Sequence, residues 1–173
     1  PFLARIFPDA QFLHIIRDGR DVALSYSKKP WLQAASAGCG RYEPGGYPYG
    51  PYPRFWVEPE RAEEFQTTSD IHRCVWAWRR YTESILEAAQ DLPTDRYHEL
   101  RYETMVRMPE DEALRILDFL EISRPESRRG FERAMAQAKG GSVGRWQQEI
   151  PPSDLARIET EAGSLLRRLG YAG

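Results

Sequence analysis

Apolar and polar positions along this chain form a pattern of short strands and amphipathic helices. The first apolar run, residues 12–16, contains β-branched side chains and has turn residues on both sides, which predicts a strand. Both alternating sets of positions in the run contain apolar residues, so we expect the strand to be covered on both faces, as in a parallel sheet. A helix is predicted to follow from Val22 to about Lys29, with Asp21 as its N-cap and Pro30 as its stop.

Helical periodicity and a second alternating segment account for most of the remaining chain. Residues 68–90 repeat apolar positions along one helix face, and the tryptophans in this segment are interpreted as core residues. Residues 96–102 alternate and predict a second strand, which would bring Tyr102 to the same sheet edge as Arg17. Further helices are predicted over residues 111–121, 125–139 and 153–169. Strands alternating with helices place the chain in the α/β class.

Composition limits the classes of partner. The chain has 173 residues, of which 41% are hydrophobic, and this is enough for one globular domain with a core. Its net charge of −2 argues against a nucleic-acid partner, so any anion site must be local. Two cysteines, Cys39 and Cys74, are too few for a disulfide or metal framework, which favours a cytoplasmic location, and a single bridge between them stays open. No apolar run is long enough for a membrane span, and the spacing of the three histidines does not suggest a metal site.

The segment from residue 30 to residue 55 is rich in glycine, proline and tyrosine. This composition excludes regular secondary structure, and a loop of such length in a compact domain is usually functional or disordered. Its many aromatic rings argue against plain disorder. Two interpretations stay open: a wall that encloses an apolar or phenolic acceptor, and a surface loop or packing contact.

The turn after the first strand carries the candidate chemistry. Arg17 is expected at the carboxyl end of the strand, and Ser25 lies eight positions later in the helix that follows. Ligands of open α/β sheets bind at this edge, and helix N-termini favour anions. An arginine and a hydroxyl could therefore hold a phosphate. The alternative is a solvated corner in which the charges of residues 17–21 pair with one another.

A second candidate is the glycine pair after the predicted charged helix. Gly140 and Gly141 would let the backbone approach an anion, and successive N–H groups could surround it. The alternative is a helix C-cap followed by a linker.

Three blocks of the sequence resemble the sulfotransferases that use 3′-phosphoadenosine 5′-phosphosulfate (PAPS). Residues 7–26, F-P-D-A-Q-F-L-H-I-I-R-D-G-R-D-V-A-L-S-Y, resemble the 3′-phosphate motif of that family, whose arginine and serine match Arg17 and Ser25. Residues 101–106, R-Y-E-T-M-V, resemble a second family segment, although Thr104 replaces the usual acidic residue. This second likeness implies that Tyr102 lies near the adenine.

The third block, residues 139–146, is K-G-G-S-V-G-R-W and resembles the late basic glycine loop of the family. It implies that Lys139, Gly141 and Arg145 lie at the 3′-phosphate. Many members have Arg-Lys-Gly where this chain has Lys-Gly-Gly, so the match of single residues is weaker here than the match of the block.

The resemblance implies an α/β fold, namely an incomplete P-loop-type three-layer parallel sheet flanked by helices. The family's 5′-phosphosulfate loop precedes the first block, and no G-x-x-x-x-G-K-[ST] pattern is present, so residues 1–173 are expected to be the C-terminal part of a single sulfotransferase domain. The expected function is transfer of a sulfuryl group from PAPS to a hydroxyl or amine acceptor, without a metal. This chain would supply the 3′-phosphate half of the site, and we expect the fragment alone to be inactive.

Two other functions are weighed against the transferase. One is a non-catalytic module that binds adenosine 3′,5′-bisphosphate or a partner, and the other is a P-loop kinase, which the 3′-phosphate motifs disfavour. The sequence singles out no catalytic base, no particular acceptor and no oligomeric state. His14 lies on the strand face opposite Arg17 and is interpreted as a packed or hydrogen-bonded residue.

Overall fold

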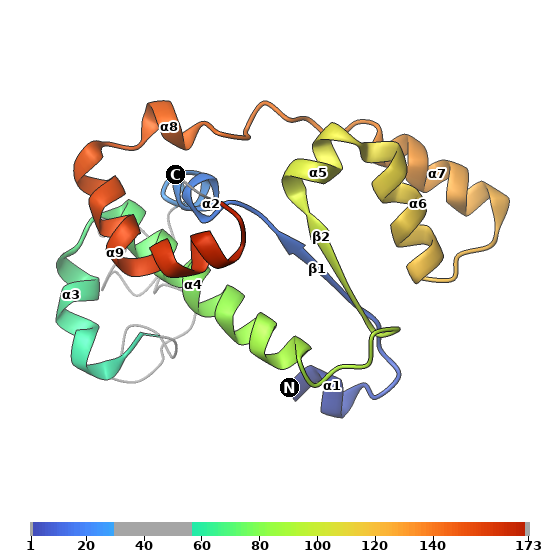
Figure 1. Ribbon diagram of the computed structural model, residues 1–173, viewed down its shortest axis with the longest axis horizontal. Coiled ribbons are helices and arrows are strands. Elements are labelled where there is room, and N and C mark those ends of the chain that lie inside the picture. The colour runs from blue at the N-terminus through green and yellow to red at the C-terminus, as the bar shows by residue number, and fades with distance from the viewer. Residues whose placement is uncertain (1, 30–56, 172–173) are drawn as a thin grey trace. The chain divides into compact units, whose positions relative to one another are not determined.

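The computed structural model describes residues 2–29 and 57–171, which contain helices and one two-stranded parallel sheet (Figure 1). The chain divides into two compact units, which we describe separately. We call residues 1–17 and 84–143 the strand unit, and residues 18–83 and 144–173 the helical unit. The predicted mixed α/β class is confirmed, and the parallel pair is compatible with the larger sheet expected from the resemblance.

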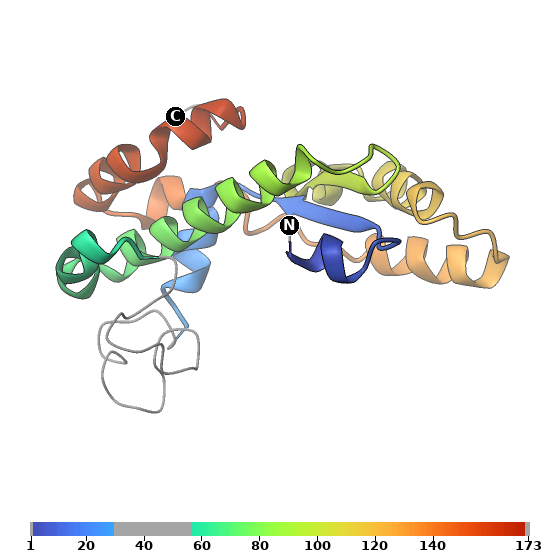
Figure 2. The same cartoon turned by 90° about the horizontal axis from the view of Figure 1, so that it is seen from below.

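The strand unit contains both strands and the helices that follow the second one. Its elements are α1 (Phe2–Ile6), β1 (Phe12–Ile16), β2 (Tyr97–Arg101), α5 (Tyr102–Arg107), α6 (Pro109–Phe119) and α7 (Pro125–Met135). Helices α6 and α7 lie side by side in both views (Figures 1 and 2). The apolar face of α6 is buried as its period predicts, with Ala113, Ile116 and Leu117 at its centre. Helix α7 ends before the predicted Lys139, because turns at residues 136–138 precede the glycine pair.

The two strands run parallel in a register that sets the position of the site. Phe12 lies opposite Tyr97, and Ile16 lies opposite Arg101. Ile16 is buried, but Ile15 is 53% exposed. The expectation of cover on both faces is therefore wrong for the described residues. Successive side chains point to opposite faces of a sheet, and here one face of β1 is half-buried to buried whereas the other is exposed.

The helical unit packs short helices on two long ones. Its elements are α2 (Gly19–Tyr26), the 3-10 helix η3 (Pro59–Arg61), α3 (Ala62–Thr67), α4 (Asp70–Ala89, assigned to this unit up to Glu83), α8 (Trp146–Glu149) and α9 (Pro152–Arg168). The tryptophans of α4 are core residues as predicted: Trp76 is fully buried and Trp78 is 7% exposed. A Cβ atom at Gly19 would lie only 2.4 Å from the Trp78 ring, so α2 can pack there only with glycine.

The predicted N-caps of α2 and α9 are wrong. Helix α2 begins at Gly19 rather than at Val22, and its N-cap is Asp18, whose side chain accepts a hydrogen bond from the Arg20 backbone N–H. Helix α9 begins at Pro152 rather than after Ser153, because proline suits the first helical turn, where its missing N–H has no cost.

Candidate anion-binding site

The candidate site lies in the strand unit, at the carboxyl ends of the two strands. Arg17 directly follows β1, and Tyr102 directly follows β2 as the first residue of α5. The parallel register makes these two residues neighbours, and the Arg17 guanidinium carbon lies 4.4 Å from the centroid of the Tyr102 ring. This contact confirms the prediction that the second strand brings Tyr102 to the sheet edge of Arg17.

A loop that follows α7 contacts both of these side chains. We call residues 139–142 the glycine loop. Arg17 Nη2 donates a hydrogen bond of 2.6 Å to the carbonyl oxygen of Ser142. The Tyr102 hydroxyl donates to the carbonyl oxygen of Lys139 and shares a hydrogen bond with Ser142 Oγ, both at 3.2 Å. The structure therefore brings Arg17, Tyr102 and the glycine loop together.

The Arg17 guanidinium is incompletely paired. Its Nε is buried and has no hydrogen-bond partner, and none of the carboxylates in the described ranges forms an ion pair with it. A guanidinium has five N–H donors, and burying a donor without a partner costs about 1–3 kcal/mol. An anion is the ligand that such a group favours.

Two other predicted residues belong to the glycine loop. The Lys139 side chain is exposed and, within the part of the chain that the structure describes, has no ion-pair partner. Gly141 is exposed, and no atom lies within 4 Å of the position that a Cβ would take. A larger side chain would therefore fit at position 141 in this structure. The predicted role of Gly141 depends on a ligand that approaches its backbone closely.

Ser25 and Arg145 lie in the helical unit. Ser25 is exposed on α2. Arg145 is the exposed N-cap of α8, and its Nε donates to Glu149 Oε1 at 2.6 Å. This hydrogen bond raises the pKa of Arg145, and the hydrogen bonds from Arg145 and Lys28 lower the pKa of Glu149. The assignments of Ser25 and Arg145 to the 3′-phosphate stay predictions.

Sequence reasoning missed the role of Asp21. Its carboxylate is buried and accepts hydrogen bonds from the backbone N–H of Gly144 at 2.6 Å and from that of Trp146 at 3.1 Å. Gly144 has a φ of 75°, which explains the glycine at this position. The signal was the second aspartate of D-G-R-D: once Asp18 caps α2, Asp21 lies inside the helix and must find donors elsewhere.

The alternative of a self-paired corner holds for part of the turn. Asp18 and Arg20 form a buried ion pair of 2.8 Å, and the Arg20 guanidinium also lies 3.7 Å from the centroid of the Trp146 ring. The turn is thus paired but not solvated. Arg17 is not a member of this pair.

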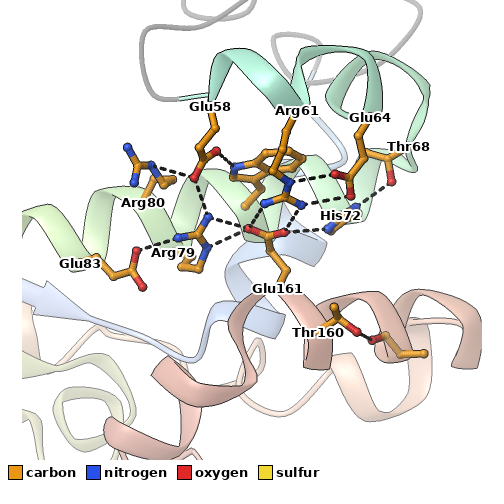
Figure 3. A network of polar contacts seen from close by, with 12 residues as sticks. Glu58, Arg61, Glu64, Thr68, His72, Arg79, Arg80, Glu83, Thr160 and Glu161 are labelled. Carbon is orange, nitrogen blue, oxygen red and sulfur yellow. Dashed lines mark hydrogen bonds and ion pairs between the residues drawn. The ribbon is translucent and has the colours of Figure 1, made fainter.

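A second polar cluster lies in the helical unit and is shown in Figure 3. Its centre is Glu161 of α9, whose side chain is 3% exposed. Arg61 and Arg79 each approach a Glu161 oxygen at 2.7 Å. Burial alone would raise the pKa of Glu161, but hydrogen bonds from His72, Arg61 and Arg79 outweigh burial and hold this pKa at about 2. We call this group the Glu161 cluster.

The Glu161 cluster contains a row of groups that superficially resembles a nucleophile, a base and an orienting acid. Thr68 Oγ1 lies 2.7 Å from His72 Nδ1, and His72 Nε2 lies 3.3 Å from Glu161 Oε2. However, both oxygens of Glu161 already accept hydrogen bonds from arginines, so the carboxylate connects η3, α4 and α9. The nearby carboxylate of Glu58 accepts hydrogen bonds from Trp76 and Arg79. We assign this cluster to the fold.

Other expectations have simpler outcomes. His14 is hydrogen-bonded as predicted, with its Nδ1 2.7 Å from the Tyr97 hydroxyl oxygen. Cys74 is buried, which raises the pKa of its thiol to about 12.

The aromatic loop of residues 30–55 and Cys39 lie outside the described residues. Within the described ranges, no group of three potential metal ligands occurs, and none of the helices is both long and apolar enough to cross a bilayer.

A family model described as "Sulfotransferase family" matches residues 55–126, which include β2 and Tyr102. The match confirms the resemblance to sulfotransferases, and it covers the second of the three blocks from which that resemblance was drawn. No curated protein matches the chain.

Proposed function

We propose that this chain serves sulfuryl transfer from PAPS to a hydroxyl or amine acceptor, and that it binds the 3′-phosphate of the nucleotide through Arg17. The sulfotransferase-family match favours this reaction class. The observation that carries the proposal is the Arg17 guanidinium at the end of a parallel strand, with a buried Nε that has no partner. A doubly charged phosphate would supply acceptors of the required strength.

The residues of the strand unit suit the binding half of such a site. Arg17 would bind the phosphate through charge-assisted hydrogen bonds, and Lys139 would add a mobile positive charge from the glycine loop. The backbone N–H of Gly141 could donate to the same anion. From the resemblance, Ser25 and Arg145 would complete the phosphate contacts.

Bound PAPS supplies the activated sulfuryl group, and the chemistry needs positioning of the two substrates more than covalent help from the protein. The S–O bond to the nucleotide phosphate breaks as the acceptor oxygen or nitrogen bonds to sulfur, and a base takes the acceptor proton. The role of this chain in the reaction would be to bind the nucleotide tightly. We name no base, because the acidic residue Glu58 and the histidines His14 and His72 are all hydrogen-bonded within the fold.

The test is calorimetric titration of the full chain with adenosine 3′,5′-bisphosphate and with adenosine 5′-phosphate. The wild type should prefer the bisphosphate, and Arg17→Ala should weaken its binding about 10- to 100-fold, since one charge-assisted hydrogen bond contributes about 1.5–3 kcal/mol. Binding of the 5′-phosphate should change little.

Arg96→Ala is the matched control. Arg96 also lies in the strand unit and also donates to backbone carbonyls, those of Ala10 and Phe7, but at the opposite end of the strands. Its removal should leave both affinities unchanged. Equal affinity of the wild type for the two nucleotides would contradict the proposal.

A further inference from the structure

The Tyr102 side chain is occupied by protein contacts on its ring and at its hydroxyl. The Arg17 guanidinium lies over the ring, with its central carbon 4.4 Å from the ring centroid, which is within cation–π distance. The hydroxyl bonds to Lys139 and Ser142 of the glycine loop. The resemblance assigns Tyr102 to the adenine, but these contacts connect it instead to the residues that would hold the phosphate.

The glycine loop also occupies Arg17. The Ser142 carbonyl accepts from Arg17 Nη2, although a neutral carbonyl is a weaker acceptor for a guanidinium than a phosphate oxygen. Tyr102 bonds to the loop at two other atoms, the Lys139 carbonyl and the Ser142 hydroxyl. The loop would therefore remain attached to Tyr102 if an anion replaced the carbonyl at Arg17.

We propose that Tyr102 is a positioning residue for the 3′-phosphate: its ring orients Arg17, its hydroxyl retains the glycine loop, and the phosphate replaces the Ser142 carbonyl at Arg17. This inference rests on the proposed function and describes how Tyr102 positions the groups that bind the phosphate at the same site. The glycine loop changes its partner at Arg17 while its attachment to Tyr102 persists.

Two nucleotides distinguish positioning from contact with adenine. If Tyr102 orients Arg17, Tyr102→Leu should weaken binding of adenosine 3′,5′-bisphosphate about 3- to 30-fold, which is the range of a cation–π contact, and leave adenosine 5′-phosphate unchanged. If Tyr102 instead stacks on adenine, both nucleotides lose affinity by the same factor. That result, or no change for either nucleotide, overturns the inference.

A second variant tests the hydroxyl separately and remains informative if Tyr102→Leu does not fold. Tyr102→Phe keeps the ring over Arg17, so it should retain the bisphosphate affinity to within about threefold. Its glycine loop should exchange amide hydrogens faster, including the Val143 N–H that donates to the Gly140 carbonyl. Unchanged exchange at residues 139–143, or a loss of affinity well beyond threefold, overturns the inference.

Tyr97 offers the matched controls, because it starts the strand that Tyr102 follows and its hydroxyl bonds to His14. Tyr97→Phe and Tyr97→Leu should change neither the nucleotide preference nor the amide exchange of the glycine loop.

The proposed function can fail independently of this inference. It is refuted if the wild type binds the two nucleotides equally, or if Arg17→Ala binds the bisphosphate with unchanged affinity. Selective binding that depends on Arg17 but not on Tyr102 refutes only the positioning role.

Discussion

Arginines serve different purposes in the two units of this molecule. In the Glu161 cluster, Arg61 and Arg79 both face carboxylates, and the shared acceptor Glu161 is buried (Figure 3). In the strand unit, Arg17 faces a carbonyl oxygen and an aromatic ring, and its Nε has no partner. The comparison teaches that the pairing of an arginine, rather than its burial, distinguishes a cation that stabilises the fold from one available to a ligand.

Electrostatics explains why the pairing of an arginine distinguishes these two roles. Removing one member of a buried ion pair leaves an uncompensated charge, so such pairs are sensitive to mutation. An arginine without a carboxylate retains its full attraction for an incoming anion. Mutations in the Glu161 cluster should therefore lower the stability of the fold, whereas mutation of Arg17 should lower the affinity for an anion.

The largest effect is expected for Glu161→Gln. The substitution keeps the shape but removes the charge that Arg61 and Arg79 share, so the free energy of unfolding should fall by about 2–3 kcal/mol in urea denaturation. Glu83→Gln is the control, because Glu83 also pairs with Arg79 but is 40% exposed. It should cost less than about 0.5 kcal/mol. Equal losses for the two variants would mean that the cluster is no more structural than a surface pair.

Acid should reveal the same cluster without a mutation. The pKa of Glu161 is about 2 in the folded chain against an ordinary value of 4.5. Its contribution to stability is complete above about pH 4.5 and is lost as the pH falls toward 2, by up to about 3 kcal/mol. Urea denaturation at pH 6, 4 and 3 should show about 2 kcal/mol of this loss in the wild type, since pH 3 is still above the folded pKa. In Glu161→Gln the curve should be flatter by that amount, and parallel curves would contradict the assignment.

A small effect on stability is expected for Arg17→Met, although this arginine is the centre of the candidate site. The lost hydrogen bond to the Ser142 carbonyl is offset by removal of a buried unpaired donor, so the free energy of unfolding should change by less than about 1 kcal/mol. Arg79→Met, which leaves Glu161 with fewer partners, should cost clearly more. The comparison between the two regions would be wrong if Arg17→Met destabilised the chain as much as Arg79→Met.

Local patterns were sufficient for the helices and for the approach of Tyr102 to Arg17. Helical period identified α4 and α6, and alternation identified β2, whose parallel pairing with β1 then fixes the site. The N-cap of α2 was not predictable, because Asp18 and Asp21 are equally good caps. The choice depends on Gly144, whose N–H is 123 positions from Asp21 and far beyond any local window.

The Glu161 cluster was equally hidden in the sequence. Its charged residues come from η3, α4 and α9 and would each fit a solvated helix face. Only tertiary packing brings Glu161 to Arg61, 100 positions away. The exposed face of β1 could not be read from the sequence either, because an apolar run does not indicate how many of its faces are covered.

The contact between Arg17 and the Ser142 carbonyl joins residues 125 positions apart. During synthesis, Arg17 leaves the ribosome long before the glycine loop exists, and the parallel pairing of β1 with β2 must also wait for residues 97–101. A nascent chain that ends before Ser142 would therefore carry the arginine without the loop that adjoins it. Nucleotide affinity measured on stalled chains of increasing length would then report when this sheet edge becomes complete.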